Sequence, residues 1–460
     1  MGYLKYYCVM LIVFCGSVNY GQDRDTTLNI IEKGMIKYRL EDGKNKLFTY
    51  DYFGALQAFR EVLQADPDNV LASFRIAECY YELKRFDLSM KYIDQVNKGK
   101  LKRKQRKDYS LLKGKIYHRN KRLDEAMVHL EEYKNSAKKK EVLDSEVDRY
   151  ITQCKYAEVA MKDSIPVQIR NFGDHVNTVN PEYAPSITAD GKTMIFTSRR
   201  PDTKGGGVDR QFDHKYFEDI YITTLDDSDG KWTKSKGIPG SLNTEFHDAC
   251  LNISADGERI YIYRNILNVT RTGDIYVSKK SKSGKWGTPK PAADNNKEIN
   301  STYFESSASV TADGKVMYFV SDRPGGNGLA DIYYIKKKGK SEWGEAVNMG
   351  PAINSKFDEK FVYVHPDGNL LFFSSDGNTS MGGYDIFYCV KGSDGKWSPA
   401  KNLGYPINTV LDEKTFTITA DGKTAYIGAY YDGSLGDADI FEIDCSKLNL
   451  LGSEESEEKK

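Results

Sequence analysis

The sequence predicts an α + β multidomain protein, with an N-terminal α-helical repeat solenoid followed by a five-bladed β-propeller. Two observations lead to this prediction. Residues 26–162 contain few glycines and follow the 3.6-residue apolar period of amphipathic helices. From Ser164 onward the sequence becomes rich in glycine, β-branched and aromatic residues, and it repeats one pattern five times at intervals of about 54 residues.

Three stretches of the helical half repeat with a period of about 34 residues. Each copy has a small residue followed four positions later by a large apolar one, which lets the two helices of a hairpin approach closely. These pairs are Ala55 and Phe59, Ser89 and Ile93, and Ala126 and Leu130. In the preceding helices, Ala77 aligns with Gly114 and Tyr80 with Tyr117. A last helix, "EVLDSEVDRYITQCKYAEVAMK", is expected to cap the stack.

This pattern resembles tetratricopeptide repeats (TPRs), with Pro67 ending the first copy. The resemblance covers about 110 residues and is weakest in the first helix, residues 27–48. It implies that the first helices of successive hairpins line a groove for protein partners. The alternative is an ordinary solvent-exposed helix face. The groove residues would be Phe74, Glu78, Tyr81, Leu111, Lys115, His118 and Arg119.

The second half repeats four sequence features in register. The equivalent residues are the Asp-Gly aspartates 190, 256, 313, 367 and 421; the Asp-Ile aspartates 219, 274, 331, 385 and 439; the tryptophans 232, 286, 343 and 397; and the asparagines 177, 243, 300, 354 and 408. A carboxylate follows each of these asparagines by five residues, namely Glu182, Asp248, Glu305, Glu359 and Glu413. Because aspartate at a turn hydrogen-bonds to its own backbone, the repeated aspartates are interpreted as scaffold.

The pattern of each copy predicts a four-stranded antiparallel sheet, which is the unit of a propeller blade. A strand with alternating burial ends at each Asp-Gly hairpin, and an apolar strand returns from it. The returning strands carry Ile195, Tyr261, Tyr318, Phe372 and Tyr426 at equivalent positions. The fifth copy ends near Cys445 without a fourth strand, whereas a spare strand, "IPVQIRNFGDHVNT", precedes the first copy. We therefore expect the strand near Val167–Asn171 to complete the last blade.

The stretch "SDRPGGNGLADIYYIKKKGKSEWG" resembles the WD40-like, TolB-type (PD40) propeller repeat. Such a propeller behind TPR-like helices and an export signal is similar to exported Bacteroidota proteins related to the type IX secretion component PorE. That family usually continues into an OmpA-like, peptidoglycan-binding domain. Here the chain ends in "GSEESEEKK", so the peptidoglycan role is not carried over. The expected divisions are a signal peptide 1–21, helical repeats 23–163, a propeller 165–446 and a charged tail 447–460.

The N-terminal stretch has the form of a signal peptide, with Lys5, an apolar run and a cleavage zone near Gly21–Gln22. Lipidation at Cys15 is the alternative fate of this segment. The five cysteines that follow the signal peptide, Cys79, Cys154, Cys250, Cys389 and Cys445, are widely spaced, which indicates free buried thiols rather than disulfides or a metal site. Acidic and basic residues balance at 66 each, which argues against a nucleic-acid binder.

No combination of residues in the sequence indicates catalysis. The six histidines lie at unrelated repeat positions, and no GxSxG motif is present. We expect a non-enzymatic periplasmic adaptor without cofactor or metal, located at the outer membrane through protein partners in a secretion or gliding-type assembly. The alternatives are a propeller that binds glycan or cell-wall fragments in its funnel and a propeller glycosidase. The Bacteroidota resemblance also implies O-glycosylation at Thr26 and Ser164.

Overall fold

The computed structural model describes residues 28–209, 213–264, 274–293, 298–339, 342–377 and 379–451. The predicted signal peptide, Cys15, Thr26 and most of the charged tail lie outside these ranges. The chain divides into two compact units between Asn97 and Lys98. Within the described ranges, no helix combines the length and apolar character that crossing a bilayer requires.

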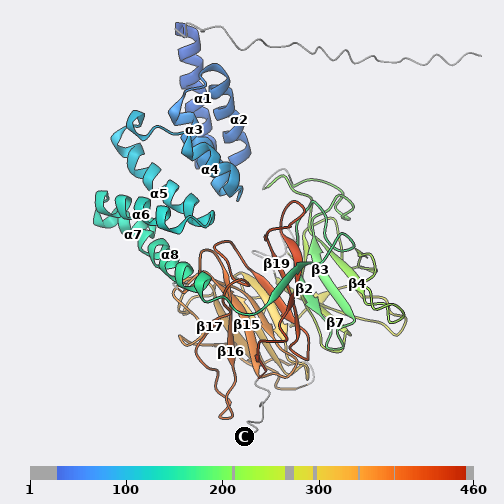
Figure 1. The fold of residues 1–460 in the computed structure, drawn as a ribbon. Coiled ribbons are helices and arrows are strands. Elements are labelled where there is room, and N and C mark those ends of the chain that lie inside the picture. The colour runs from blue at the N-terminus through green and yellow to red at the C-terminus, as the bar shows by residue number, and fades with distance from the viewer. Residues whose placement is uncertain are drawn as a thin grey trace, which may run out of the picture. The chain divides into compact units, whose positions relative to one another are not determined.

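The first unit contains two helical hairpins, labelled in Figure 1: α1 (Ile30–Phe48) with α2 (Tyr52–Ala65), and α3 (Val70–Glu82) with α4 (Phe86–Asp94). A polar side chain caps the N-terminus of three of these helices. The Asn29 side chain accepts from the Glu32 backbone N–H in a capping box, and Asp51 and Asn69 cap α2 and α3. These polar residues therefore mark the helix starts.

The predicted small residues do lie where helices approach closely. Ala55, Ala77 and Ser89 are fully buried, and the Ser89 hydroxyl donates to the Ala77 carbonyl at 2.7 Å. At Gly114 an added Cβ would come within 2.7 Å of the Leu130 side chain, so a larger residue there would push α5 away from α6. The helix pairing read from the 34-residue period is confirmed.

The second unit begins with a 3₁₀ turn (Lys98–Lys100) and four helices: α5 (Arg103–Arg119), α6 (Leu123–Ser136), α7 (Lys139–Ser145) and α8 (Val147–Lys162). The sequence places the domain boundary at Ser164, where the composition changes. Contacts instead group these four helices with the propeller and separate them from α1–α4. The change of secondary structure and the division into compact units therefore fall at different places.

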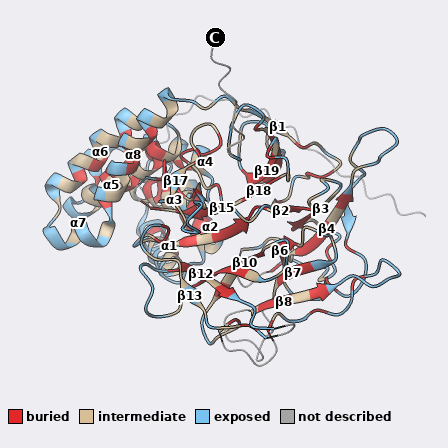
Figure 2. Cartoon of the chain, turned by 90° about the horizontal axis from the view of Figure 1, so that it is seen from below, coloured by how far each residue is buried: buried red, intermediate tan, exposed pale blue. Residues whose placement is uncertain are grey.

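The propeller consists of five four-stranded antiparallel sheets, as predicted (Figure 2). Blades 1 to 4 each run from the inner to the outer strand in chain order. Their strands are β2 (Glu182–Ile187), β3 (Thr193–Ser198), β4 (Asp219–Thr224) and β5 (Lys236–Gly237); β6 (Asp248–Ile253), β7 (Arg259–Arg264), β8 (Asp274–Lys279) and β9 (Lys290–Pro291); β10 (Glu305–Val310), β11 (Val316–Ser321), β12 (Asp331–Lys336) and β13 (Val347–Asn348); and β14 (Glu359–Val364), β15 (Leu370–Ser375), β16 (Asp385–Val390) and β17 (Lys401–Asn402).

Blade 5 joins the two ends of the propeller sequence. It contains β18 (Thr415–Ile418), β19 (Thr424–Ala429) and β20 (Asp439–Asp444), and its outer strand is β1 (Gln168–Asn171). β1 pairs antiparallel with β20, with Ile169 opposite Ile443. The predicted closure of the ring by the spare strand is confirmed.

The repeated polar residues hold the blades together. In all five Asp-Gly turns the aspartate Oδ1 accepts a hydrogen bond from the backbone N–H two residues on. Each repeated asparagine bonds both backbone groups of the isoleucine in the Asp-Ile pair of the preceding blade; Asn354, for example, accepts from Ile332 N at 2.8 Å and donates to Ile332 O at 3.0 Å. The other four pairs are Asn177 with Ile440, Asn243 with Ile220, Asn300 with Ile275 and Asn408 with Ile386.

This topology gives the propeller two distinct faces. The Asp-Gly turns and the turns between third and fourth strands lie on one face, here called the turn face. The connections into each inner strand and the loops between second and third strands lie on the opposite face, here called the entry face. Any ligand or partner of the propeller would meet different loops on the two faces.

Candidate interaction surfaces

Helix α5 is fixed to the entry face of blades 4 and 5. The His118 side chain is fully buried, and its Nε2–H donates to the Met381 carbonyl at 2.7 Å. Burial lowers the pKa of His118 to about 3, so the imidazole is neutral at this contact. The neighbouring Arg119 donates to the Val410 carbonyl at 2.8 Å and pairs with Asp412 at 3.5 Å.

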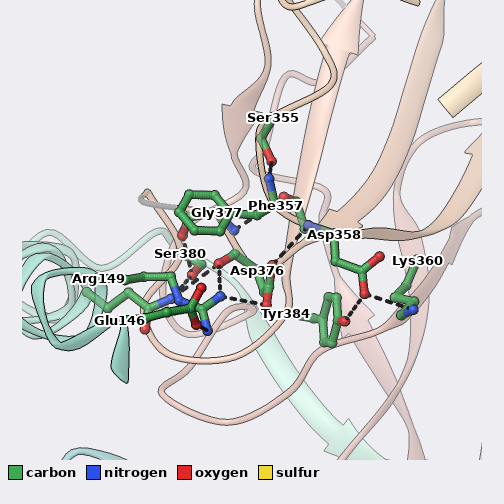
Figure 3. A network of polar contacts seen from close by, with 12 residues as sticks. Glu146, Arg149, Ser355, Phe357, Asp358, Lys360, Asp376, Gly377, Ser380 and Tyr384 are labelled. Carbon is green, nitrogen blue, oxygen red and sulfur yellow. Dashed lines mark hydrogen bonds and ion pairs between the residues drawn. The ribbon is translucent and has the colours of Figure 1, made fainter. Parts of the chain in front are cut away.

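Helix α8 makes a second set of contacts with blade 4 (Figure 3). The Arg149 guanidinium pairs with the Asp376 carboxylate at 2.7 Å and lies 5.2 Å from the Phe357 ring centroid. One turn on, the Gln153 amide donates to the Ser380 hydroxyl at 2.8 Å. Because both pairs are largely shielded from water, α8 and the propeller are expected to behave as one body.

Three of the seven predicted partner-binding residues do not line a groove for a partner. His118 and Arg119 contact the propeller of the same chain, so the prediction that they face an external partner is wrong. The Phe74 side chain on α3 is buried, with 1 % of its surface exposed, so its assignment to a partner-binding groove is also wrong. Helical periodicity shows which residues share a face but does not show what covers that face. The remaining four are half-buried: Glu78 pairs with Arg75, Tyr81 lies against Phe86, Leu111 is on α5, and Lys115 lies over the Tyr150 ring.

Replacing Arg149 with alanine is expected to weaken the attachment of α8 to blade 4. The change leaves the Asp376 carboxylate without its cation in a shielded site, so a loss of about 1–3 kcal/mol in unfolding free energy is expected. Limited proteolysis between Lys162 and Gln168 should become faster. Arg259→Ala, which removes an exposed pair with Asp256 in a blade 2 turn, is the matched control and should cost less than about 0.5 kcal/mol. Equal cleavage of both variants would contradict this role of Arg149.

A ring of buried carboxyl groups lies at the start of the inner strands. In blades 1 to 3 an arginine pairs with the carboxylate at 2.8–3.2 Å: Arg200 with Glu182, Arg264 with Asp248 and Arg323 with Glu305. Blades 4 and 5 have Gly377 and Tyr431 at the position of Arg200 and Arg323. Burial accordingly raises the pKa of Glu359 to about 7 and that of Glu413 to about 8.

The entry face of blades 1 and 2 carries a titratable cluster that the sequence reasoning missed. The His247 ring lies between Asp209 and Glu218, with each nitrogen 3.1 Å from a carboxylate oxygen. The hydrogen bond to Glu218 is the main reason that the pKa of His247 is raised. In the part of the chain that the structure describes, no group of His, Cys, Asp and Glu side chains has the arrangement of a metal site. The insertion before Asp219 was the available sequence signal, since it brings Asp209 beside His247.

Helix α1 is apolar on two opposite faces. One face contains Ile36 and packs on α2 and α3 with the core of the first unit. On the other side, Ile30 is 90 %, Ile31 78 % and Tyr38 62 % exposed. A helix with apolar residues on both sides is typical of one covered on both sides. The same unit also exposes Met35, Phe48 and Tyr50.

Ser164, the second predicted glycosylation residue, lies exposed between α8 and β1. It is therefore accessible to a modifying enzyme, and its modification stays a prediction. The other predicted residue, Thr26, is outside the described ranges.

A comparison with protein families agrees with the helical part of this fold. A family profile described as tetratricopeptide repeat matches residues 50–103. No curated protein matches the chain. Among solved structures, a complex of BT0996 with RGII is 11 % identical with a TM-score of 0.40, covering 64 % of this protein and 94 % of that one.

Two further solved structures are similar to single parts of the chain. The Yersinia enterocolitica type III secretion chaperone SycD, solved with a peptide of the translocator YopD, is 16 % identical with a TM-score of 0.24, covering 28 % of this chain and 99 % of that one. A prolyl endopeptidase is 14 % identical with a TM-score of 0.34, covering 60 % and 42 %. These likenesses are too distant to indicate a ligand, partner or reaction for this chain.

Proposed function

We propose that the protein is a non-enzymatic adaptor that binds a protein partner through the outer face of α1. The observation that carries the proposal is the group of exposed apolar residues Ile30, Ile31, Met35 and Tyr38 on a helix whose opposite face is already packed. Large exposed apolar surfaces mark interaction sites in soluble proteins. TPR-like hairpins also commonly present helix faces to other proteins.

The partner that fits this surface has an apolar helix or loop with few charges. On α1, the surface offers aliphatic side chains and the Tyr38 ring, with the Arg39 guanidinium 5.7 Å from that ring centroid. Aromatic and aliphatic side chains of this kind contribute most of the binding energy at protein interfaces. Helices α5 and α8 already contact the propeller, so α1 is the better candidate for an outside partner.

We further propose that this adaptor acts in the periplasm at the outer membrane, in a type IX secretion or gliding-type assembly. The support for this location is the predicted signal peptide and the resemblance of the PD40-like repeats to exported Bacteroidota proteins. On this proposal partners rather than a membrane span of the described chain hold the protein at the membrane. The partners are then other envelope proteins.

The proposal is tested by co-purification from an envelope extract of the source organism. The double variant Ile31→Glu, Tyr38→Glu places two charges on the α1 face and should reduce recovery of the main partner at least tenfold. The matched control is Val128→Glu, Leu143→Glu, because these residues are 66 % and 67 % exposed on other helices. Both variants should keep the wild-type melting temperature.

Three outcomes would contradict parts of this proposal. If the α1 variant retains every wild-type partner, α1 is not the docking face. If both variants lose the partner equally, the effect is not specific to α1. If all recovered partners are cytoplasmic proteins, the envelope location is wrong.

A further inference from the structure

A groove of about 700 Å³ opens on the turn face between blades 1 and 2. In Figure 2 the strands of these blades, β2–β4 and β6–β8, lie side by side. Trp286 of blade 2 forms part of its wall, and Ile222 on β4 lies on the blade 1 side. The rim is polar and includes Thr188, Thr233, Lys236 and Lys280. This volume is within the range of about 300–1,000 Å³ usual for small-molecule sites.

The groove lies where the repeat departs from its own pattern. In blade 3 the Tyr318 ring lies 6.3 Å from Tyr334 on its own sheet and 6.0 Å from Trp397 of the next blade. Tyr318 thereby fills the space between these two side chains. In blade 5, Tyr426 contacts Trp232 of blade 1 in the same way, at 6.3 Å.

Blade 1 has smaller side chains at both of these positions. Ile195 stands where the other four blades have tyrosine or phenylalanine, and it pairs across the sheet with Ile222. Blades 3 and 4 have Tyr334 and Tyr388 at the position of Ile222. Ile195 and Trp286 pack together in the core between blades 1 and 2, and the groove opens over Ile222, where blades 3 and 4 have a tyrosine ring.

The rim of the groove provides cations and hydroxyl groups. Lys234, Lys236 and Lys280 line it, and among the described residues none of the three forms an ion pair. The Lys280 ammonium lies 5.7 Å from the Trp286 ring centroid. Thr233 Oγ1 accepts from Thr224 N at 3.1 Å and lies 3.3–3.4 Å from the hydroxyl oxygens of Thr224 and Thr223, so these three threonines present a connected set of hydroxyl groups at the groove.

Two aspartates, Asp190 and Asp256, also line the groove, but their carboxylates accept hydrogen bonds within their own turns. The lysines thus outnumber the carboxylates, and the carboxylates are already engaged. The edge strand β5 contains only two residues, which is too short to accept a peptide as an added strand. A small anion rich in hydroxyl groups matches this combination better than a peptide.

We propose that this groove binds an acidic saccharide, with the lysines contacting its carboxylate and the threonines its hydroxyl groups. The sugar would lie over Ile222, beside Trp286. This site is separate from the α1 docking face and from the entry face. It therefore does not depend on the proposed adaptor function.

The test uses a panel of uronic-acid disaccharides and trisaccharides that includes cellobiouronic acid, with neutral cellobiose as its uncharged counterpart. Binding is measured by isothermal titration calorimetry on the full chain. Ile222→Tyr introduces the side chain of blades 3 and 4 and should fill the groove, so affinity should fall at least tenfold. Lys236→Glu should also lower affinity at least tenfold.

Blade 2 supplies a matched control for each variant. Val277 is the equivalent of Ile222, and Lys290 the equivalent of Lys236. Val277→Tyr and Lys290→Glu should leave the affinity within about twofold of wild type. Lys236 is exposed, so Lys236→Glu should fold even if Ile222→Tyr does not.

Specific outcomes would overturn the proposal. It is wrong if no acidic saccharide of the panel binds, or if cellobiose binds as tightly as cellobiouronic acid. It is also wrong if an acidic peptide competes equally well, because the site would then recognise charge alone. Equal losses in the blade 1 and blade 2 variants would place the binding elsewhere.

Discussion

Replacing Trp343 with alanine is expected to destabilise the propeller by about 3–5 kcal/mol, the usual cost of deleting a large aromatic side chain from a core. Trp343 is 8 % exposed and packs with Tyr261, Phe319 and other residues of blades 2 and 3. Its indole N–H donates to the Ala292 carbonyl of the neighbouring blade at 3.3 Å. The variant therefore loses both packing and a contact between blades.

The measurement is the urea dependence of the far-UV signal of the propeller strands. Trp343→Phe is the matched control, because it retains most of the ring but loses the N–H donor, and it should cost about 1–2 kcal/mol. A loss below about 1 kcal/mol for the alanine variant would show that Trp343 does not contribute to the packing between blades.

The unfolding free energy is expected to fall as the pH rises from about 4.5 to about 8. Glu413 is fully buried, and burial is the main reason that its pKa rises to about 8 in the folded protein. Between these pH values the folded state keeps a proton that the unfolded state releases, so stability decreases with pH. For Glu413 alone the loss is on the order of 3–5 kcal/mol.

Glu413→Gln should remove the part of this pH dependence that Glu413 contributes. Because glutamine is neutral at every pH, the variant should equal wild type near pH 4.5 and exceed it in stability near pH 8.5, while the raised pKa of Glu359 keeps part of the pH dependence in both proteins. Glu305→Gln in blade 3 is the matched control, since it removes the partner of Arg323 and should destabilise the protein. A Glu413→Gln variant with the wild-type pH profile would show that Glu413 ionises in the folded protein without penalty.

The blades and their closure could be predicted because the relevant signals are local or repeated. Each Asp-Gly turn is specified by two adjacent residues, and five copies in register define one blade. The helix pairing could be predicted for the same reason, since residues such as Ala55 and Phe59 are four positions apart. Local patterns of this kind specify a turn or a helix contact regardless of which distant residues pack against it.

The contacts of His118 and Arg119 could not be predicted in this way. His118 bonds to Met381, which is 263 positions away in the sequence, and nothing near His118 indicates that contact. An amphipathic pattern indicates that a face is covered or functional without distinguishing the two. The groove beside Trp286 is an intermediate case. Ile222 is visible in the sequence as an aliphatic residue where blades 3 and 4 have tyrosine, but the groove over it follows only once Trp286 is placed on the neighbouring blade.

The pairing of β1 with β20 also constrains how a newly made chain becomes a closed ring. β1 leaves the ribosome before every other propeller strand, and its partner β20 leaves after them, so the edge of β1 stays unpaired until all of the other propeller strands have been made. Helices α5 and α8 likewise precede the blade 4 and blade 5 loops that they contact. The same β1–β20 pairing made between two chains would yield a swapped oligomer. The high effective concentration of two ends of one chain favours the closed monomer, and that advantage declines as the concentration of nascent chains increases.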